Sequence, residues 1–211
     1  MSEKSAQIAA AEFIEKNTAT AAALYLFDKY YVQSGELSSI QGHKLLKLLG
    51  KAHSDNPLYM FFSGVAKFSS VCQKGMELPD MTVKDKWDRE ISLRECHPSK
   101  WLVIAAWATW QSGGYITLAS MRDTRKKFTS QQMEVLLVSL DTQHEVWKQA
   151  VANDSIGIIH CCDDGGWESQ YAKSLGIGSL PEYILVDKDN RIVDRCKSPD
   201  DMRRMLDKYI K

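Results

Sequence analysis

The residues best suited to covalent chemistry in this chain are five cysteines, Cys72, Cys96, Cys161, Cys162 and Cys196. No two of them stand three positions apart, so the chain contains no Cys-x-x-Cys pair. Such a pair supplies one thiolate that attacks a substrate disulfide and a second thiol that resolves the mixed disulfide. The odd number leaves at least one thiol without a partner in the chain. Dithiol exchange at the usual spacing is therefore not expected.

Three of these thiols leave a second interpretation open. Cys161 and Cys162 are adjacent and suit a vicinal disulfide or a redox switch, and Cys96 precedes His97 in an expected loop. Buried thiols in a strand commonly serve packing. Nothing beside Cys96 in the sequence would lower its pKa. A structural role is favoured, and an oxidoreductase that uses these atypical cysteines stays as the alternative.

A metal centre is not expected from the distribution of ligand-type residues. The chain has five histidines, and its densest group of such residues is His160-Cys161-Cys162. Adjacent residues of a strand point to opposite faces of the sheet. These three side chains therefore cannot bind one ion, and we predict neither a metal site nor a cofactor.

A glycine-rich turn, Ser112-Gly113-Gly114, stands between an expected strand and an expected helix. The free N–H groups at a helix N-terminus can bind a small anion, but the turn is too short for a nucleotide-binding loop. Ser112 has no base near it in the sequence and is a poor nucleophile. We favour a plain turn, and small-anion binding at Ser112–Gly114 remains a further alternative.

The charge balance and hydropathy exclude other classes of protein. The chain has 27 basic and 27 acidic side chains, whereas a nucleic-acid-binding protein usually carries a basic surface. No apolar run approaches the ~20 residues that span a bilayer, and Met1–Gln7 lacks the apolar core of a signal peptide. Two explanations stay open, a cytoplasmic protein or a chain from which an export segment has been removed.

The spacing of apolar residues predicts two regions of different structure. Residues 1–73 are expected to form helices, the second opened by Asn17 or Thr18 and the fourth by Asn56. In residues 74–211 short apolar runs alternate with helical patterns, which predicts an α/β domain with a mixed sheet. The expected strands are 81–84, 90–93, 101–106, 135–140, 156–161, 183–186 and 191–193, and the expected helices are 114–129, 142–151, 167–175 and 200–210.

Residues 74–211 resemble the TlpA-like branch of the thioredoxin superfamily, which is grouped with the alkyl-hydroperoxide reductase/thiol-specific antioxidant proteins. Five phrases carry the resemblance in the family's order: Gly75–Asp85 (GMELPDMTVKD), Ile91–Leu93 (ISL), Trp107–Trp110 (WATW), Val138–Asp141 (VSLD) and Gly176–Val193 (GIGSLPEYILVDKDNRIV). The resemblance implies a thioredoxin-like fold, a mixed central sheet flanked by helices, here with an N-terminal all-α extension. It also implies a periplasmic or envelope-associated location, with a cytoplasmic one still open.

The chain departs from that family where the family does its chemistry. The motif Cys-Gly-Pro-Cys would fall on Gln111, Ser112, Gly113 and Gly114, so neither redox cysteine is present. Ala105 stands where redox-active relatives keep a buried acidic residue. We expect no catalytic residue here and lean against an enzyme. We also expect that cysteines restored at positions 111 and 114 would form a reversible disulfide.

One element of the family's site is retained. Pro181 follows Leu180 at the position of the family's cis-proline, where free backbone groups can pair with an extended peptide. By the same resemblance Trp110 would flank this groove. The leading interpretation is a redox-inactive module that binds a peptide or protein at Trp110, Leu180 and Pro181, or that serves as a structural unit. Pro181 retained as a structural turn alone is the other interpretation.

Overall fold

The computed structural model describes residues 3–34, 37, 39–69 and 71–210. Contacts divide the chain into two compact units, Met1–Ser70 and Val71–Lys211. No helix within the described ranges is long and apolar enough to cross a membrane.

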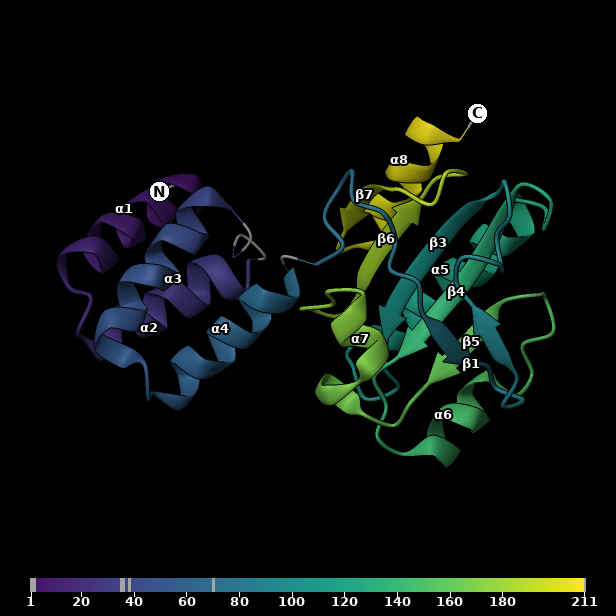
Figure 1. Ribbon diagram of the computed structural model, residues 1–211, viewed down its shortest axis with the longest axis horizontal. Coiled ribbons are helices and arrows are strands. Elements are labelled where there is room, and N and C mark those ends of the chain that lie inside the picture. The colour runs from purple at the N-terminus through teal and green to yellow at the C-terminus, as the bar shows by residue number, and fades with distance from the viewer. Residues whose placement is uncertain (1–2, 35–36, 38, 70, 211) are drawn as a thin grey trace. The chain divides into compact units, whose positions relative to one another are not determined.

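The N-terminal unit is built from helices (Figure 1). They are α1 (Glu3–Lys16), α2 (Ala21–Phe27), the π-helical turn η1 (Asp28–Val32), α3 (Ile40–His53) and α4 (Pro57–Ser69). Their apolar faces meet in one cluster, in which Ile14, Phe27, Leu45, Leu49 and Phe62 are fully buried. The helical spacing of these residues in the sequence therefore reports the buried face of each helix.

The N-terminal caps explain where two of these helices begin. Asn56 accepts a hydrogen bond from the backbone N–H of Leu58, as expected from its place before the helix. The second helix is capped by Thr20, whose hydroxyl accepts from Ala23 N. The expectation of Asn17 or Thr18 was wrong because the Asn17 side chain instead donates back to the carbonyl of Phe13 at the end of α1.

The C-terminal unit contains the α/β sheet. Its elements are β1 (Thr82–Lys84), β2 (Glu90–Ser92), β3 (Trp101–Trp107), α5 (Gly114–Lys127), β4 (Met133–Ser139), α6 (His144–Val151), β5 (Ile159–Cys162), the 3-10 turn η3 (Gly166–Glu168), α7 (Gln170–Ser174), β6 (Glu182–Val186), β7 (Ile192–Cys196) and α8 (Pro199–Tyr209). The five-stranded sheet has the order β5-β4-β3-β6-β7, and β1 and β2 form a separate antiparallel hairpin. Strands β3, β4 and β5 are parallel, whereas β6 and β7 run antiparallel to their neighbours. The mixed sheet is as expected from the sequence.

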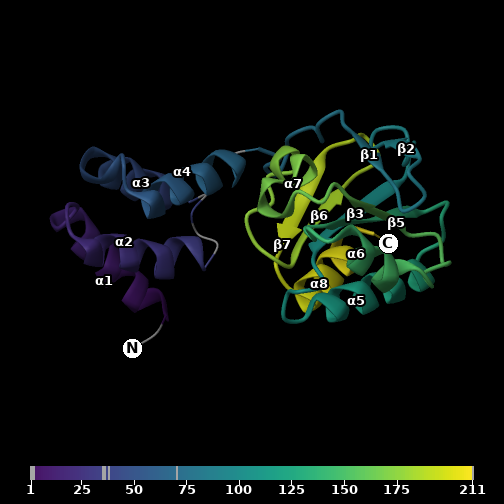
Figure 2. The same ribbon diagram turned by 90° about the horizontal axis from the view of Figure 1, so that it is seen from below.

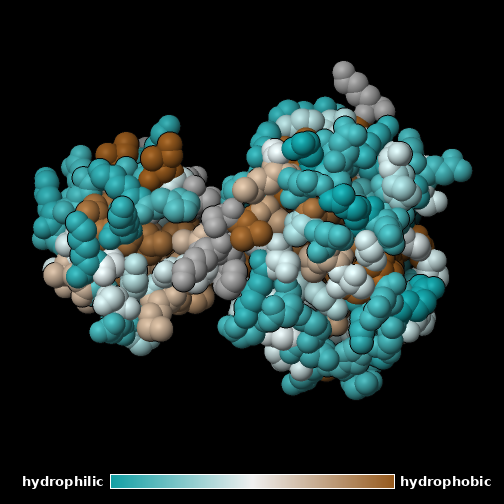
Figure 3. All heavy atoms as spheres, in the orientation of Figure 1, coloured by the Kyte–Doolittle hydropathy of each residue, from teal (hydrophilic) through white to brown (hydrophobic). Residues whose placement is uncertain are grey.

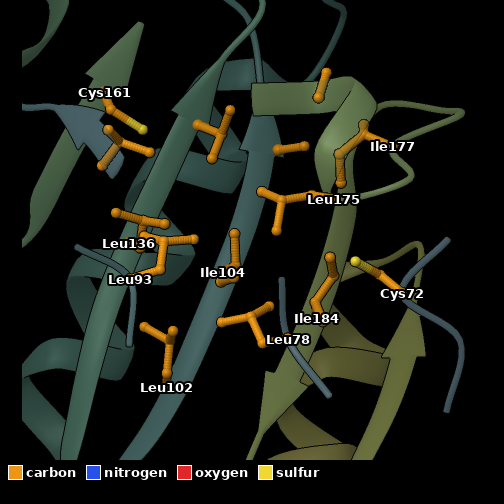
Figure 4. Close-up of a cluster of buried hydrophobic side chains, with 14 of the residues drawn as sticks. Cys72, Leu78, Leu93, Leu102, Ile104, Leu136, Cys161, Leu175, Ile177 and Ile184 are labelled. Carbon is orange, nitrogen blue, oxygen red and sulfur yellow. The ribbon is translucent and has the colours of Figure 1, made fainter. Parts of the chain in front are cut away.

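Alternate residues of the central strand β3 build two hydrophobic layers. Leu102 and Ile104 point to the layer covered by α7 and the β1–β2 hairpin (Figure 4). Val103 and Ala105 point to the layer covered by α5, α6 and α8. Figure 2 shows these two sets of elements on opposite sides of the sheet. Because both faces of β3 are covered, its sequence is an unbroken apolar run.

Several connecting loops lie together at one end of the sheet, the end at which β3 and β4 finish. The carboxyl ends of parallel strands meet at one edge of a sheet, and that edge commonly carries the functional site of an open α/β fold. Residues 108–113 follow β3, residues 140–143 follow β4, and the loop 176–181 leads into β6 at the same end. Elsewhere the face of this unit seen in Figure 3 is mainly hydrophilic, with apolar residues in small separate patches.

Candidate functional site

The connection from β3 to α5 is a pair of tight turns. Gln111 N donates to Ala108 O at 3.3 Å, and Gly114 N donates to Gln111 O at 2.9 Å. Gly113 precedes the helix with φ of +84°, a left-handed conformation that glycine adopts freely and proline cannot. The backbone of this turn therefore favours glycine at position 113 and excludes proline there.

Gly114 is the first residue of α5 and has no room for a side chain. A Cβ atom built on it would lie 2.1 Å from the carbonyl oxygen of Ala108. That neighbour is a backbone atom, so the chain itself would have to move to admit even a methyl group. This contact argues against the expectation that cysteines at 111 and 114 would form a reversible disulfide, because position 114 cannot hold a thiol unless the turn shifts.

The side chain of Gln111 reaches across to the loop before β6. Its Nε2 donates to the carbonyl oxygen of Leu180 at 3.3 Å, and the Leu180–Pro181 peptide bond is cis. Gln111 Oε1 is buried and has no hydrogen-bond partner among the described residues, and the same is true of the Oγ of Ser179, the residue before Leu180. The structure thus brings together three residues that the sequence assigned to the site, while Ser112 is exposed.

Trp110 forms a half-exposed aromatic surface beside this contact. Its indole Nε1 donates to Leu140 O at 3.3 Å, and its ring centroid lies 6.4 Å from that of Trp167 at an interplanar angle of 59°. Trp110 and Trp167 are 54% and 47% exposed, and Tyr115 and Ile116 of the first turn of α5 are more exposed still. Sequence reasoning missed Trp167, which it placed only at the start of a helix.

A buried carboxylate anchors the start of the β3–α5 connection. Asp141, two residues after the end of β4, accepts hydrogen bonds from Thr109 N at 3.1 Å, from Thr109 Oγ1 at 2.5 Å and from Ser139 Oγ at 2.5 Å. Hydrogen bonds to a charged acceptor are among the stronger ones in proteins. They fix the backbone immediately before Trp110, and so fix where its indole lies.

A buried ion pair holds the loop that carries Leu180. Glu182, the first residue of β6, accepts from Arg195 Nη2 at 2.7 Å and from Gly178 N at 3.1 Å. The same guanidinium donates to the carbonyls of Leu175 and Gly176, both at 3.0 Å. Arg195 and Glu182 thus tie together both ends of the loop 176–181.

Position 105 has become part of the apolar core. Ala105 is fully buried, with Leu137 and Tyr183 as its partners on the neighbouring strands. An unpaired carboxylate in such surroundings would be costly. Alanine at this position therefore suits the packing of the sheet and offers no group that could transfer a proton.

The cysteines are all free thiols, and burial keeps them protonated. Cys161 and Cys162 belong to opposite hydrophobic layers, so their side chains point away from each other. Burial raises the pKa of Cys96 to about 12 and that of Cys162 to about 12, and it raises the pKa of Cys161 well above its ordinary value. No observation here favours the interpretation that these thiols exchange disulfides.

The N-terminus of α5 has none of the side chains that would support anion binding. Residues 108–121 contain no lysine, arginine or histidine. The residues that follow Gly114 in the first turn include exposed Tyr115 and Ile116, which are an aromatic and an aliphatic residue. The alternative of small-anion binding at Ser112–Gly114 gains no support from this arrangement.

Comparisons with known proteins agree with this architecture. Residues 74–195 match the family model described as the AhpC/TSA family. The thiol-disulfide oxidoreductase ResA of Bacillus cereus is 22% identical over 153 residues, covering 72% of this chain and 86% of that protein. ResA of Bacillus anthracis gives the same identity and coverage.

Solved structures extend the similarity to the fold. A thiol-disulfide oxidoreductase from Bacteroides fragilis has a TM-score of 0.56 and 23% identity, covering 64% of this chain and 100% of that one. A thioredoxin-like protein from Bacteroides caccae has a TM-score of 0.69 and 13% identity, covering 99% of this chain and 78% of that one. The thioredoxin-like fold expected from the sequence is confirmed.

Proposed function

The chain belongs to the AhpC/TSA family, and from that premise we propose that it is a peptide- or protein-binding module without dithiol activity at the usual site. The observation that carries the proposal is the close approach of Gly114 to Ala108 O, 2.1 Å from where a Cβ would stand. The resemblance places the second redox cysteine at this position, and the turn has closed over it. Gln111, at the position of the first cysteine, contributes an amide in place of a nucleophile.

Binding is supported by the surface that remains around this turn. The Trp110–Trp167 pair is exposed beside Gln111, whose amide contacts Leu180 O. Exposed aromatic side chains are enriched where proteins bind partners, because they bury a large area with few rotatable bonds. An extended peptide can add to the backbone at Leu180 as a strand adds to a sheet edge. Asp141 and Arg195 hold the two sides of this groove in place, which lowers the entropy cost of binding.

The test is selection of peptides from a display library against the folded chain, followed by affinity measurement on variants. Trp110→Ala should weaken binding at least about tenfold, the range of an aromatic anchor at an interface. Trp87→Ala is the matched control, because Trp87 is similarly exposed, at 61% against 54% for Trp110, but lies in the β1–β2 turn. Unchanged affinity in Trp110→Ala would contradict the proposed groove.

Absence of redox activity has its own test. The wild-type chain should not accelerate reduction of insulin by dithiothreitol above the uncatalysed rate. Turnover that disappears in Cys96→Ser or Cys161→Ser would instead establish the atypical-cysteine oxidoreductase. A periplasmic or envelope-associated location is proposed from the family resemblance alone, and fractionation of the source cells tests it.

A further inference from the structure

The amide of Gln111 is chemically the same group as a peptide bond. Its Nε2 makes the hydrogen bond to Leu180 O that a strand added at this loop would make with a backbone N–H. The carbonyl that a bound peptide needs is therefore already engaged by this chain's own side chain.

We propose that the Gln111 carboxamide is an internal substitute for the backbone of a bound strand, so that Gln111 gates the groove and must turn away before an extended peptide pairs with Leu180. This inference rests on the proposed function, because Gln111 would regulate the same peptide-binding site. A ligand must then donate a backbone N–H to Leu180 O in place of the Gln111 amide.

The hydrogen bond between Gln111 and Leu180 is weak enough to break when a peptide binds. The 3.3 Å bond joins two neutral groups, which makes it one of the weaker kinds in proteins. Gln111 Oε1 is buried without a partner in this arrangement, and a buried acceptor left unpaired opposes the closed state. When the side chain turns outward, water can bind both ends of the amide. Leu180 O is then free.

A second unpaired polar group belongs to the residue before Leu180. Ser179 Oγ is buried and has no partner among the described residues. Ser179 directly precedes Leu180, whose carbonyl accepts from Gln111. A bound peptide backbone has both donors and acceptors to offer, so it can satisfy groups that the closed state leaves unpaired.

The experiment compares peptide affinity in the wild type, Gln111→Ala and Gln131→Ala, using a peptide selected against the wild-type chain. Gln131 is an exposed glutamine in the turn before β4 and is the matched control. Removing the internal competitor should tighten binding about two- to tenfold, the equilibrium equivalent of one neutral hydrogen bond. The Gln131→Ala variant should bind as the wild type does.

A second readout follows the contact itself. In the free protein, NMR should show the side-chain amide protons of Gln111 close to Leu180 and Pro181, and these cross-peaks should disappear when the peptide binds. In the peptide, N-methylation at one position should abolish binding to both wild type and Gln111→Ala, because the methyl group removes the N–H that Leu180 O requires.

The outcomes separate the gate from the binding function. Equal or weaker binding in Gln111→Ala, with the peptide still bound by the wild type, would overturn the gate alone. Cross-peaks that persist in the complex would do the same. If neither the wild type nor Gln111→Ala selects any peptide, the binding function fails and the gate fails with it.

Discussion

The carbonyl oxygen of Ala108 stands 2.1 Å from the point where a Cβ of Gly114 would be placed. This approach lets the chain turn directly from β3 into α5, and it removes the space that a thiol at position 114 would need. Position 114 therefore has neither a thiol nor the space for one in this backbone.

The first prediction concerns this turn. Gly114→Ala should lower the free energy of unfolding by about 1–3 kcal/mol or more, because a methyl group inserted against a backbone oxygen forces the turn to shift. Urea denaturation followed by circular dichroism measures it. Ser112→Ala is the control, since Ser112 is exposed and should change stability by less than about 0.5 kcal/mol.

The same geometry bears on the double variant Gln111→Cys with Gly114→Cys. Its two new thiols should stay reduced when the folded protein is treated with oxidised glutathione, and mass spectrometry after alkylation would count them. A disulfide that forms readily in a protein of wild-type stability would show that the turn adapts more easily than its close contact indicates.

The second prediction concerns pH and His160. Burial lowers the pKa of this imidazole from its ordinary 6.5 to about 4, although Asp154 Oδ2 lies 3.1 Å from its Nε2. The unfolded chain therefore binds a proton at higher pH than the folded chain does, so stability decreases as the pH falls. The loss should occur between pH 6.5 and pH 4 and amount to about 3 kcal/mol.

A variant isolates this group from other titrations. His160→Gln cannot gain a proton, so its stability should change less than that of the wild type between pH 6.5 and pH 4, as measured by urea denaturation at each pH. The paired Asp154 contributes below this window: burial raises its carboxyl pKa, but the hydrogen bond from Arg122 and the nearby His160 outweigh burial and leave the pKa lowered. Parallel curves for the two proteins would rule out His160 as the source of acid sensitivity.

The third prediction concerns the thiols. Because burial raises the pKa of Cys96 to about 12 and of Cys196 to about 12, little thiolate is present at neutral pH. Iodoacetamide should alkylate the folded chain far more slowly than free cysteine, and all five thiols should react at ordinary rates in urea. Rapid labelling of Cys96 in the folded protein would revive its interpretation as a reactive residue.

Much of the fold could be predicted from the sequence, because buried apolar residues recur with the spacing of the helix or strand that carries them. The unbroken apolar run 101–106 predicted β3 (Trp101–Trp107), and the helical pattern over 200–210 predicted α8 (Pro199–Tyr209). The site was less readable, since its contacts join distant segments. Gln111 and Leu180 are 69 positions apart, and nothing in either local sequence shows that the amide meets the carbonyl.

Two further features of the site depend on three-dimensional packing in the same way. The tilted contact between Trp110 and Trp167 joins the connections that follow β3 and β5, two strands separated by β4 in the sheet, so no local sequence pattern shows it. The Gly114 contact depends on the path of the backbone over a few residues, and the glycine in the sequence is equally compatible with an open turn.

The last prediction separates the position of the loop 176–181 from its direct contacts with a peptide. Arg195→Ala leaves the Glu182 carboxylate buried without its ion pair, and removing one partner of a buried pair typically costs about 3–5 kcal/mol. It also frees the carbonyls of Leu175 and Gly176. The variant should unfold at lower urea concentration and bind a selected peptide more weakly.

Replacing both Arg195 and Glu182 distinguishes the effect on stability from the effect on peptide affinity. Arg195→Met with Glu182→Leu removes the buried charges together and should recover much of the stability. It does not restore the hydrogen bonds to the loop carbonyls, so peptide affinity should stay low even when stability returns. If affinity recovers together with stability, the guanidinium serves folding alone and the loop finds its position without it.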